Sequence, residues 1–433
     1  MRILFFLFIF FQVFPLFAAN NDSLISTKYW NYRVNLHRDF VAVGEGKGRS
    51  ICAAGRVVDG KRMSLYYGDN ITYHGWYVGM LATEYAMLKR HHKPTEFTLL
   101  ELYFALKAVD RLDSVAETFY KDNRGNYGKA SLNGFFVRDD VDQEQKKLFP
   151  GIDFVYSDYL LGLSTPERLQ SDNEMSQDQA IHLLLGLRLV QHFVDENANV
   201  KNTNIRQLAI NQGLRILTWI GRDKWIVKNP VTLSPVYRGP DARLFSYAFC
   251  KIALQFAEGK INSDFPRYTA ASPLGWGLLQ TGFVPVHFNR AMIMILATAG
   301  NSWINKGITN YSLSWYDVLW QKQVFPLIHA ELNDVKTIHS TRISKMKIQK
   351  LLSESDSSGI FTLGPYGWNT SNRWLASHYK YKTYDGFHAQ RQNTGLDFMI
   401  LCNLYFLRFG TEIPQNYLPN QQFIEVFTQR LEN

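Results

Sequence analysis

The stretch Ser171–Val194, SDNEMSQDQAIHLLLGLRLVQHFV, joins an acidic, polar start to a helix that is apolar on nearly every side. A helix with apolar residues all round is usually buried, whereas a surface helix keeps one polar face. Acidic side chains are favourable in the first turn, where backbone N–H groups lack partners. The stretch therefore predicts an inner helix that begins near Gln177 and presents carboxylates at its amino-terminal end.

One residue of this helix, Asp178, is a candidate for chemistry. Asp178 and His182 are four residues apart, so both side chains fall on one helix face. We consider Asp178 a candidate catalytic acid or base, with Asp172 as the second candidate and Asn173 as a candidate substrate-binding residue. The alternative is a helix cap followed by a solvated acidic first turn, which the same residue types would satisfy.

The chain begins with MRILFFLFIFFQVFPLFAA, which has the composition of a secretory signal peptide. Arg2 supplies the positive charge, Ile3–Phe17 the apolar run, and Ala18–Ala19 the small residues near a cleavage point. An uncleaved anchor is the alternative. No later stretch reaches the roughly 18 continuous apolar residues of a spanning helix. We therefore expect a signal peptide at 1–19 and a secreted or periplasmic domain at 20–433, with no stable membrane span.

Composition narrows the class of partner. The net charge of +9 is spread along the chain and would attract an anionic partner. It is not gathered into a basic run or a nucleic-acid motif, so nucleic acid is not expected as a partner. The three cysteines cannot form a disulfide framework, and no Cys or His spacing suits a metal. We therefore expect no cofactor.

Helix-forming segments alternate with polar, aromatic loops along most of the chain. Residues 68–92 and 94–120 have helical apolar spacing and a short connection, which predicts an antiparallel hairpin. Val41–Lys61 contains four glycines and predicts a loop. We count about nine to eleven helices with few strand-like alternations. Because no Gly- or Pro-rich linker divides them, we predict one all-α domain of helix hairpins.

The long polar segment Lys121–Gln170 is predicted to be a loop. A loop of this length inside a compact domain is usually functional. Its acidic residues do not have the spacing of an EF-hand, although a calcium loop is conceivable. The charged residues that it contributes include Arg138, Asp139, Asp140 and Asp142.

Several aromatic and polar residues near predicted loops are further candidates. Tryptophan rings beside glycine-containing loops can stack on sugar rings, with core packing as the alternative. His74 is a candidate catalyst, although a histidine among aromatic residues is often only packed or hydrogen-bonded. The candidate substrate-binding residues here are Trp76, Trp276, Trp368 and Arg238.

The segment Tyr384–Asp397 contains the residue types that a polysaccharide lyase requires. Such an enzyme neutralises a uronate carboxylate, abstracts a proton and protonates the leaving oxygen. The candidate catalytic residues are Tyr384, His388 and Arg391, with Asn393 to bind substrate. The alternative is a helix capped by Asn393 or Thr394, with Asp397 in its first turn.

The sequence Asp172-Asn173-Glu174-Met175, followed by the leucine-rich helix, resembles unsaturated glucuronyl hydrolases and related toroid polysaccharide lyases. The rhythm of helix pairs extends this likeness over most of residues 65–410. The resemblance implies an (α/α) toroid of helix hairpins. It also implies an exported glycoside hydrolase that acts on uronic-acid-containing or other acidic oligo- or polysaccharides by general acid/base catalysis. The alternatives are a lyase that uses the Tyr/His/Arg/Asn set, and a non-catalytic glycan-binding or helical-array interaction protein.

Overall fold

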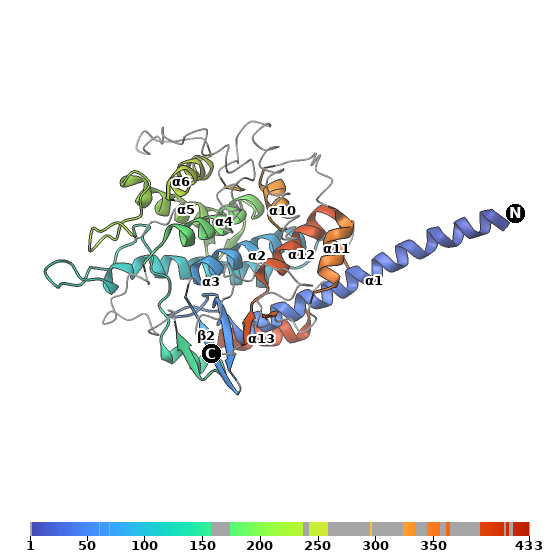
Figure 1. The fold of residues 1–433 in the computed structure, drawn as a ribbon, viewed down its shortest axis with the longest axis horizontal. Coiled ribbons are helices and arrows are strands. Elements are labelled where there is room, and N and C mark those ends of the chain that lie inside the picture. Colours follow the sequence, from blue (N-terminus) through green and yellow to red (C-terminus); the bar gives the residue numbers. More distant parts are fainter. Residues whose placement is uncertain are drawn as a thin grey trace.

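The computed structural model shows a mostly helical chain with a small sheet at one side (Figure 1). At the level of class, the all-α prediction is confirmed. The residues that the structure describes are 2–59, 61–68, 70–156, 174–236, 242–258, 295–296, 324–333, 344–355, 361–363, 390–410, 413–414 and 419–432.

The first predicted hairpin is confirmed by helices α2 (Asn70–Arg90) and α3 (Glu96–Ser114). The end of α2 lies beside the start of α3, where the Thr98 hydroxyl donates to Glu84 over 2.7 Å. The start of α2 lies beside a later turn of α3, where the His74 ring bonds the carbonyl of Ala105 over 3.1 Å. The two helices are therefore antiparallel.

The predicted inner helix is α4 (Gln177–Phe193), and its apolar residues are buried on all sides. Ser176 is its N-cap residue and Asp178 lies in its first turn. Its partner is α5 (Ile205–Arg222), whose N-cap Asn204 accepts a hydrogen bond from the backbone N–H of Gln207 over 2.8 Å.

Helices α2 and α4 run parallel and approach closely through glycines. A Cβ at Gly75 would lie 2.2 Å from the carbonyl oxygen of His182, and one at Gly186 would lie 2.2 Å from the carbonyl oxygen of Gly75. One turn on, a Cβ at Gly79 would lie 2.7 Å from Leu189. Only residues without a side chain allow this separation, so the glycines set the distance between the two buried helices.

Helix α12 (Leu396–Phe409) lies on the other side of α2 and runs in the same direction. The Asn403 amide donates to the carbonyl of Met80 over 3.3 Å, and Arg90 at the end of α2 bonds the carbonyl of Leu407. The predicted cap at Asn393 or Thr394 is wrong. The N-cap is Gly395, which adopts a left-handed conformation (φ 70°) that glycine tolerates best.

Helix α1 (Arg2–Asp39) projects at its start and packs at its end (Figure 1). From Ile25 onward it buries large side chains, including Tyr29 and Tyr32, against the other helices. The described part of the chain contains no helix that is both long and apolar enough to cross a membrane. The remaining described helices are α6 (Ala242–Phe256), α10 (Val324–Leu332), α11 (Lys345–Ser353) and α13 (Gln421–Glu432).

The predicted loop at Val41–Lys61 is partly wrong, because its last residues form strand β1 (Gly55–Asp59). This strand belongs to a five-stranded sheet of order β3-β2-β1-β7-β6. Strand β1 pairs with β7, which lies far along the chain, so its local sequence could not reveal the pairing. The other strands are β2 (Arg62–Tyr66), β3 (Phe154–Tyr156), β6 (Phe361–Leu363) and β7 (Gln390–Asn393).

The remaining short elements lie in the connections between helices. They are the 3-10 turns η1 (Ala116–Phe119) and η2 (Gln143–Leu148), and the paired strands β4 (Asn199–Val200) and β5 (Thr203–Asn204).

The close contact between α2 and α4 predicts that Gly75→Ala will destabilise the protein. The added Cβ would meet backbone atoms of α4, which move only if the helices separate. Overpacking of this kind costs ~1–3 kcal/mol in the free energy of unfolding, which urea denaturation would measure. The exposed α5 substitution Asn211→Ala is the control and should change stability by less than about 0.5 kcal/mol. Equal effects of the two substitutions would contradict the assigned helix contact.

Candidate functional site

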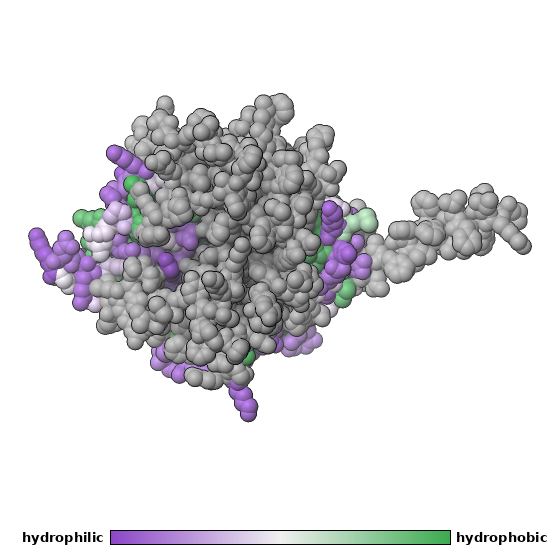
Figure 2. All heavy atoms as spheres, in the orientation of Figure 1, coloured by the Kyte–Doolittle hydropathy of each residue, from purple (hydrophilic) through white to green (hydrophobic). Residues whose placement is uncertain are grey.

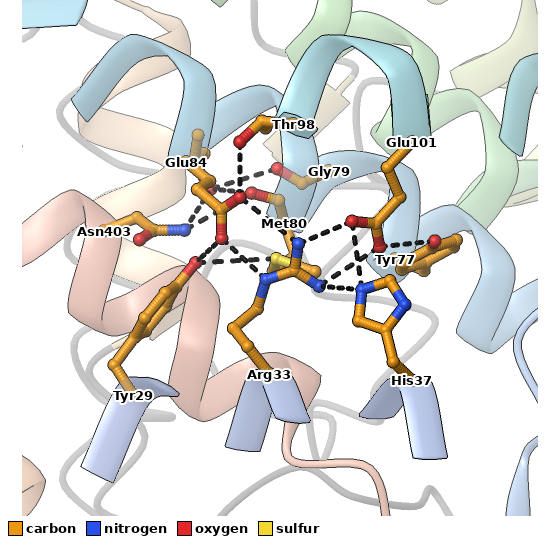
Figure 3. Close-up of polar contacts among 11 residues, drawn as sticks. Tyr29, Arg33, His37, Tyr77, Gly79, Met80, Glu84, Thr98, Glu101 and Asn403 are labelled. Carbon is orange, nitrogen blue, oxygen red and sulfur yellow. Dashed lines mark hydrogen bonds and ion pairs between the residues drawn. The ribbon is translucent and has the colours of Figure 1, made fainter. Parts of the chain in front are cut away.

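Two clusters of charged side chains stand out among the described residues. The first is a buried ionic cluster centred on Arg33 of α1 (Figure 3). Arg33 Nε lies 2.7 Å from Glu84 of α2, and Arg33 Nη2 lies 2.6 Å from Glu101 of α3. All three side chains are at most 1% exposed. One guanidinium thus joins three helices.

The two carboxylates of this ionic cluster accept further hydrogen bonds. The Tyr29 hydroxyl donates to Glu84, and the Tyr77 hydroxyl donates to Glu101 over 2.6 Å. Burial would raise the pKa of Glu101, but the adjacent Arg33 and His37 together outweigh burial and hold that pKa well below its usual value. Both carboxylates are thus paired with Arg33 and already accept additional donors. The ionic cluster therefore holds the fold together and is not the candidate site.

The second cluster, which we call the Asp139 cluster, comprises Tyr120, Arg138, Asp139, Glu174 and Asn229. It forms where α3 ends and α4 begins. After α3 the chain turns through η1 to Tyr120, and residues 135–141 then pass back beside α3. The Val137 N–H donates to the carbonyl of Leu112 over 3.3 Å, and Val137 forms an antiparallel bridge with Glu174.

Glu174 and Arg138 form the half-buried part of the Asp139 cluster. Arg138 Nε donates to the backbone carbonyl of Glu174 over 3.1 Å. The Asn229 amide donates to Glu174 Oε1 over 2.6 Å. Arg138 thus holds the backbone of Glu174, and Asn229 holds its carboxylate, just before helix α4 begins.

Asp139 and Tyr120 form its buried part. Asp139 is fully buried, and its Oδ1 accepts the N–H of Val141 over 3.0 Å. Tyr120 is 3% exposed, and its hydroxyl has no hydrogen-bond partner among the described residues. Burial, together with the nearby negative charges of Glu174 and Asp139, raises the pKa of Tyr120 well above its usual value. The phenol is therefore protonated at neutral pH, and its hydroxyl can donate a hydrogen bond.

The neighbouring Asp140 has a structural role. Its carboxylate lies 2.6 Å from Arg111 of α3 and accepts the N–H of Gly48 over 3.0 Å. It fixes residues 135–141 to the helix and to the glycine-containing loop.

Asp178 lies near the Asp139 cluster in sequence, in the first turn of α4. It is half-buried, and its Oδ1 accepts hydrogen bonds from the Ser176 hydroxyl and, over 3.0 Å, from the N–H of Gln179. His182, one turn on, is buried and accepts a hydrogen bond from the Trp76 indole over 3.1 Å. His182 thus serves the contact between α4 and α2, and a catalytic role for Asp178 stays a prediction.

The structure places Trp76 and His74 in the core. Trp76 is 4% exposed, and its ring centroid lies 6.2 Å from that of Phe325. It packs between helices, which agrees with the alternative of core packing. His74 is fully buried, and burial lowers its pKa to about 4, so its ring is neutral at physiological pH.

Two residues of the predicted lyase set belong to the sheet. Arg391 and Asn393 lie in β7, where their backbones pair with Val57 of β1 and Phe361 of β6. The other predicted site residues lie outside the described residues; they are Asp172, Asn173, Arg238, Trp276, Trp368, Tyr384 and His388.

The sequence located the Asp139 cluster only in part. The length of the loop after α3 marked it as functional, and Arg138 and Asp139 lie within it. Glu174 belongs to the acidic start of the inner helix. Nothing in the local sequence singles out Tyr120 or Asn229, because each becomes relevant only when distant segments meet.

The ionic cluster predicts a large loss of stability in Arg33→Met. The substitution keeps an apolar side chain of similar length but leaves two buried carboxylates without their cation. Removing one partner of a buried ion pair costs about 3–5 kcal/mol, which urea denaturation at neutral pH would measure. Lys147→Met, in an exposed pair with Glu144, is the control, with an expected loss of about 0–1 kcal/mol.

The pH dependence of the stability of Arg33→Met tests the same ion pair a second time. In the wild type, the lowered pKa of Glu101 contributes stability above the usual carboxyl pKa of about 4.3, and acidification removes it. Without Arg33, burial raises the pKa of Glu101. Acidification should therefore protonate this carboxyl in Arg33→Met and recover part of the lost free energy of unfolding. If both proteins lose stability in parallel on acidification, Arg33 does not hold Glu101 ionised.

The burial of His74 predicts a separate pH effect. The pKa of His74 is lowered from 6.5 to about 4, so the unfolded chain binds a proton that the folded chain does not. This contribution to stability is complete above pH 6.5 and is lost as the pH falls from 6.5 to about 4. His74→Gln, which retains a donor toward Ala105, should flatten the dependence in that window. The measurement is the free energy of unfolding of both proteins between pH 6.5 and about 4. If His74 is protonated in the folded wild type, the two proteins will show the same dependence on pH.

In comparisons with known proteins, no family model, no curated protein and no solved structure matches this chain. The functional argument below is therefore built on the contacts of the chain itself.

Proposed function

We propose that the protein is an exported glycoside hydrolase that acts on uronic-acid-containing oligo- or polysaccharides. The observation that carries this proposal is the composition of the Asp139 cluster. Two carboxylates, a guanidinium and a protonated phenol gather where the inner helix α4 begins. Acid/base chemistry on a sugar, with a cation for its carboxylate, requires groups of these kinds.

We further propose that the helices form an (α/α) toroid of hairpins. The direction of the helices supports this. The buried helices α12, α2 and α4 run parallel to one another, while α3 runs opposite to α2. Helix α5 runs in the direction of α3, since Gln212 and Arg215 contact Leu106 and Asp113 in the same order. In a ring of helix hairpins, all inner helices run in one direction and all outer helices run in the opposite direction.

The residues of the Asp139 cluster suit distinct roles in hydrolysis. We assign Asp139, fully buried, as the proton donor, and Glu174, held by Asn229, as the base that activates water. Arg138 would bind the uronate carboxylate, because a guanidinium matches the two oxygens of a carboxylate. Asp178 remains the alternative carboxylate at the same end of α4.

Export rests on the amino-terminal segment. Residues 1–19 have signal-peptide composition, and Ile25 is the first buried residue of α1 among the side chains that the structure describes. In Figure 1 the start of α1 projects away from the other helices. Cleavage after residue 19 would therefore leave the Arg33 contacts intact.

A polysaccharide lyase is the second candidate, and Tyr120 favours it. A lyase needs a residue that moves protons and a cation that neutralises the uronate. The Tyr120 hydroxyl, without a partner among the described residues, and the adjacent positive charge of Arg138 supply both. The lyase set expected at Tyr384, His388, Arg391 and Asn393 stays a separate prediction.

Substitution of the carboxylates tests the hydrolase proposal. Asp139→Asn and Glu174→Gln should each lower turnover by about 10²–10⁴-fold, the usual contribution of a general acid or base. The assay follows absorbance of the unsaturated uronate and release of reducing ends on a panel of uronic polymers. Loss of absorbance indicates an unsaturated glucuronyl hydrolase, gain indicates a lyase, and reducing ends alone indicate another hydrolase.

Two further variants complete the design. Glu144→Gln, an exposed position on η2, should retain full turnover. Asp178→Asn decides between the carboxylates: if it alone abolishes turnover while Asp139→Asn does not, the catalytic assignment moves to Asp178. Glycan binding without turnover by the wild type would instead favour a non-catalytic glycan-binding protein.

A further inference from the structure

The segment Lys121–Lys129, KDNRGNYGK, forms a hairpin directly after the buried Tyr120. Lys121 and Tyr127 form an antiparallel bridge. The Asp122 carboxylate accepts the N–H of Arg124 over 2.8 Å and the N–H of Asn126 over 2.9 Å. The only acidic side chain of the hairpin is therefore engaged in shaping its turn.

The hairpin presents an aromatic ring among cations. Tyr127 is 41% exposed, and Lys121 Nζ lies 4.6 Å from its ring centroid. Arg124 and Lys129 are exposed as well. Charged side chains alone would keep an exposed loop solvated, so solvation does not explain the exposed tyrosine ring. The combination of an exposed ring and three cations suits a chain of sugars that carries carboxylates.

The base of the hairpin is fixed beside the Asp139 cluster. The N–H of Gly128 donates to the carbonyl of Tyr120 over 3.1 Å. A Cβ at Gly128 would lie 2.5 Å from Val231 and 2.7 Å from Glu117, so the hairpin rests directly on both. In Figure 1 the hairpin projects at the left of α3, and Figure 2 shows mainly hydrophilic atoms at that edge.

We propose that the hairpin Lys121–Lys129 is a subsite that binds an anionic polysaccharide beyond the reacting sugar. Tyr127 stacks on a pyranose face, while Arg124 and Lys129 contact carboxylates of neighbouring residues. This inference rests on the proposed function, because the Asp139 cluster then marks where the chain is cut. The subsite acts on affinity for long chains and leaves the chemical step unchanged.

Paired charge-removing variants test this subsite. Binding of polygalacturonate to the full-length protein is measured by calorimetry for Arg124→Ala/Lys129→Ala and for Lys347→Ala/Lys350→Ala. Both double variants remove two exposed cations, but the control pair lies on α11, at the opposite side of Figure 1. The hairpin pair should weaken binding by roughly 2- to 20-fold, on the scale of two exposed ionic contacts. The α11 pair should bind as the wild type does.

The tyrosine has its own matched control. Tyr127→Ala should weaken binding of polygalacturonate by several-fold, since stacking depends on the ring. Met346→Ala removes another exposed apolar side chain, on α11, and should have no effect. On a substrate that is cleaved, Tyr127→Ala should raise KM for the polymer with little change in kcat, and should leave KM for a disaccharide unchanged.

The outcomes separate this proposal from the proposed function. Selective loss of binding in the hairpin variants supports the subsite even if no uronic polymer is cleaved, in which case the hydrolase proposal alone fails. No binding by the wild type, or equal loss in the hairpin and α11 variants, overturns the subsite whatever the turnover. Binding of single-stranded DNA of matched charge is measured last. If the hairpin variants lose DNA binding as much as polygalacturonate binding, the hairpin is a general polyanion surface, and the subsite proposal is overturned.

Discussion

The position of Arg33 between Glu84 and Glu101 is the contact on which the arrangement of α1, α2 and α3 depends. A buried charge is tolerated only when partners surround it, and here each partner comes from a different helix. Helix α1 cannot rotate or shift along its axis without exposing two carboxylates to an apolar interior. The aromatic side chains of α1, such as Tyr29, are thereby held against α2.

The spacing of α2 and α4 follows from a different constraint. Gly75 and Gly186 allow the two backbones to touch, so most of α4 is buried, while Asp178 in its first turn and His192 in its last turn reach the surface. Residues 135–141 pass this end of the helix and bring Asp139 to Glu174. The rigid pair of helices therefore sets the position of the carboxylates, while the loops supply them.

The two charged clusters differ in how their charged groups are paired. In the ionic cluster, Glu84 and Glu101 are surrounded by donors and shielded from solvent, which suits a permanent ion pair. In the Asp139 cluster, Glu174 and Arg138 are half-buried, with Tyr120 behind them. The exposed hairpin beyond Tyr120 extends the same end of the molecule toward solvent. Under the proposed function, an anionic chain would approach Asp139 from the side of the exposed cations of the hairpin.

Periodicity and composition by themselves determined the helices, the α2–α3 hairpin and the buried character of α4, because apolar spacing and short connections are local properties. They also marked the loop that holds Arg138 and Asp139. Local sequence could not determine the pairing of β1 with β7, the burial of Trp76, or the convergence of Tyr120 and Asn229 on Glu174. Each of these depends on segments far apart in the chain, and only the packed helices bring those segments together.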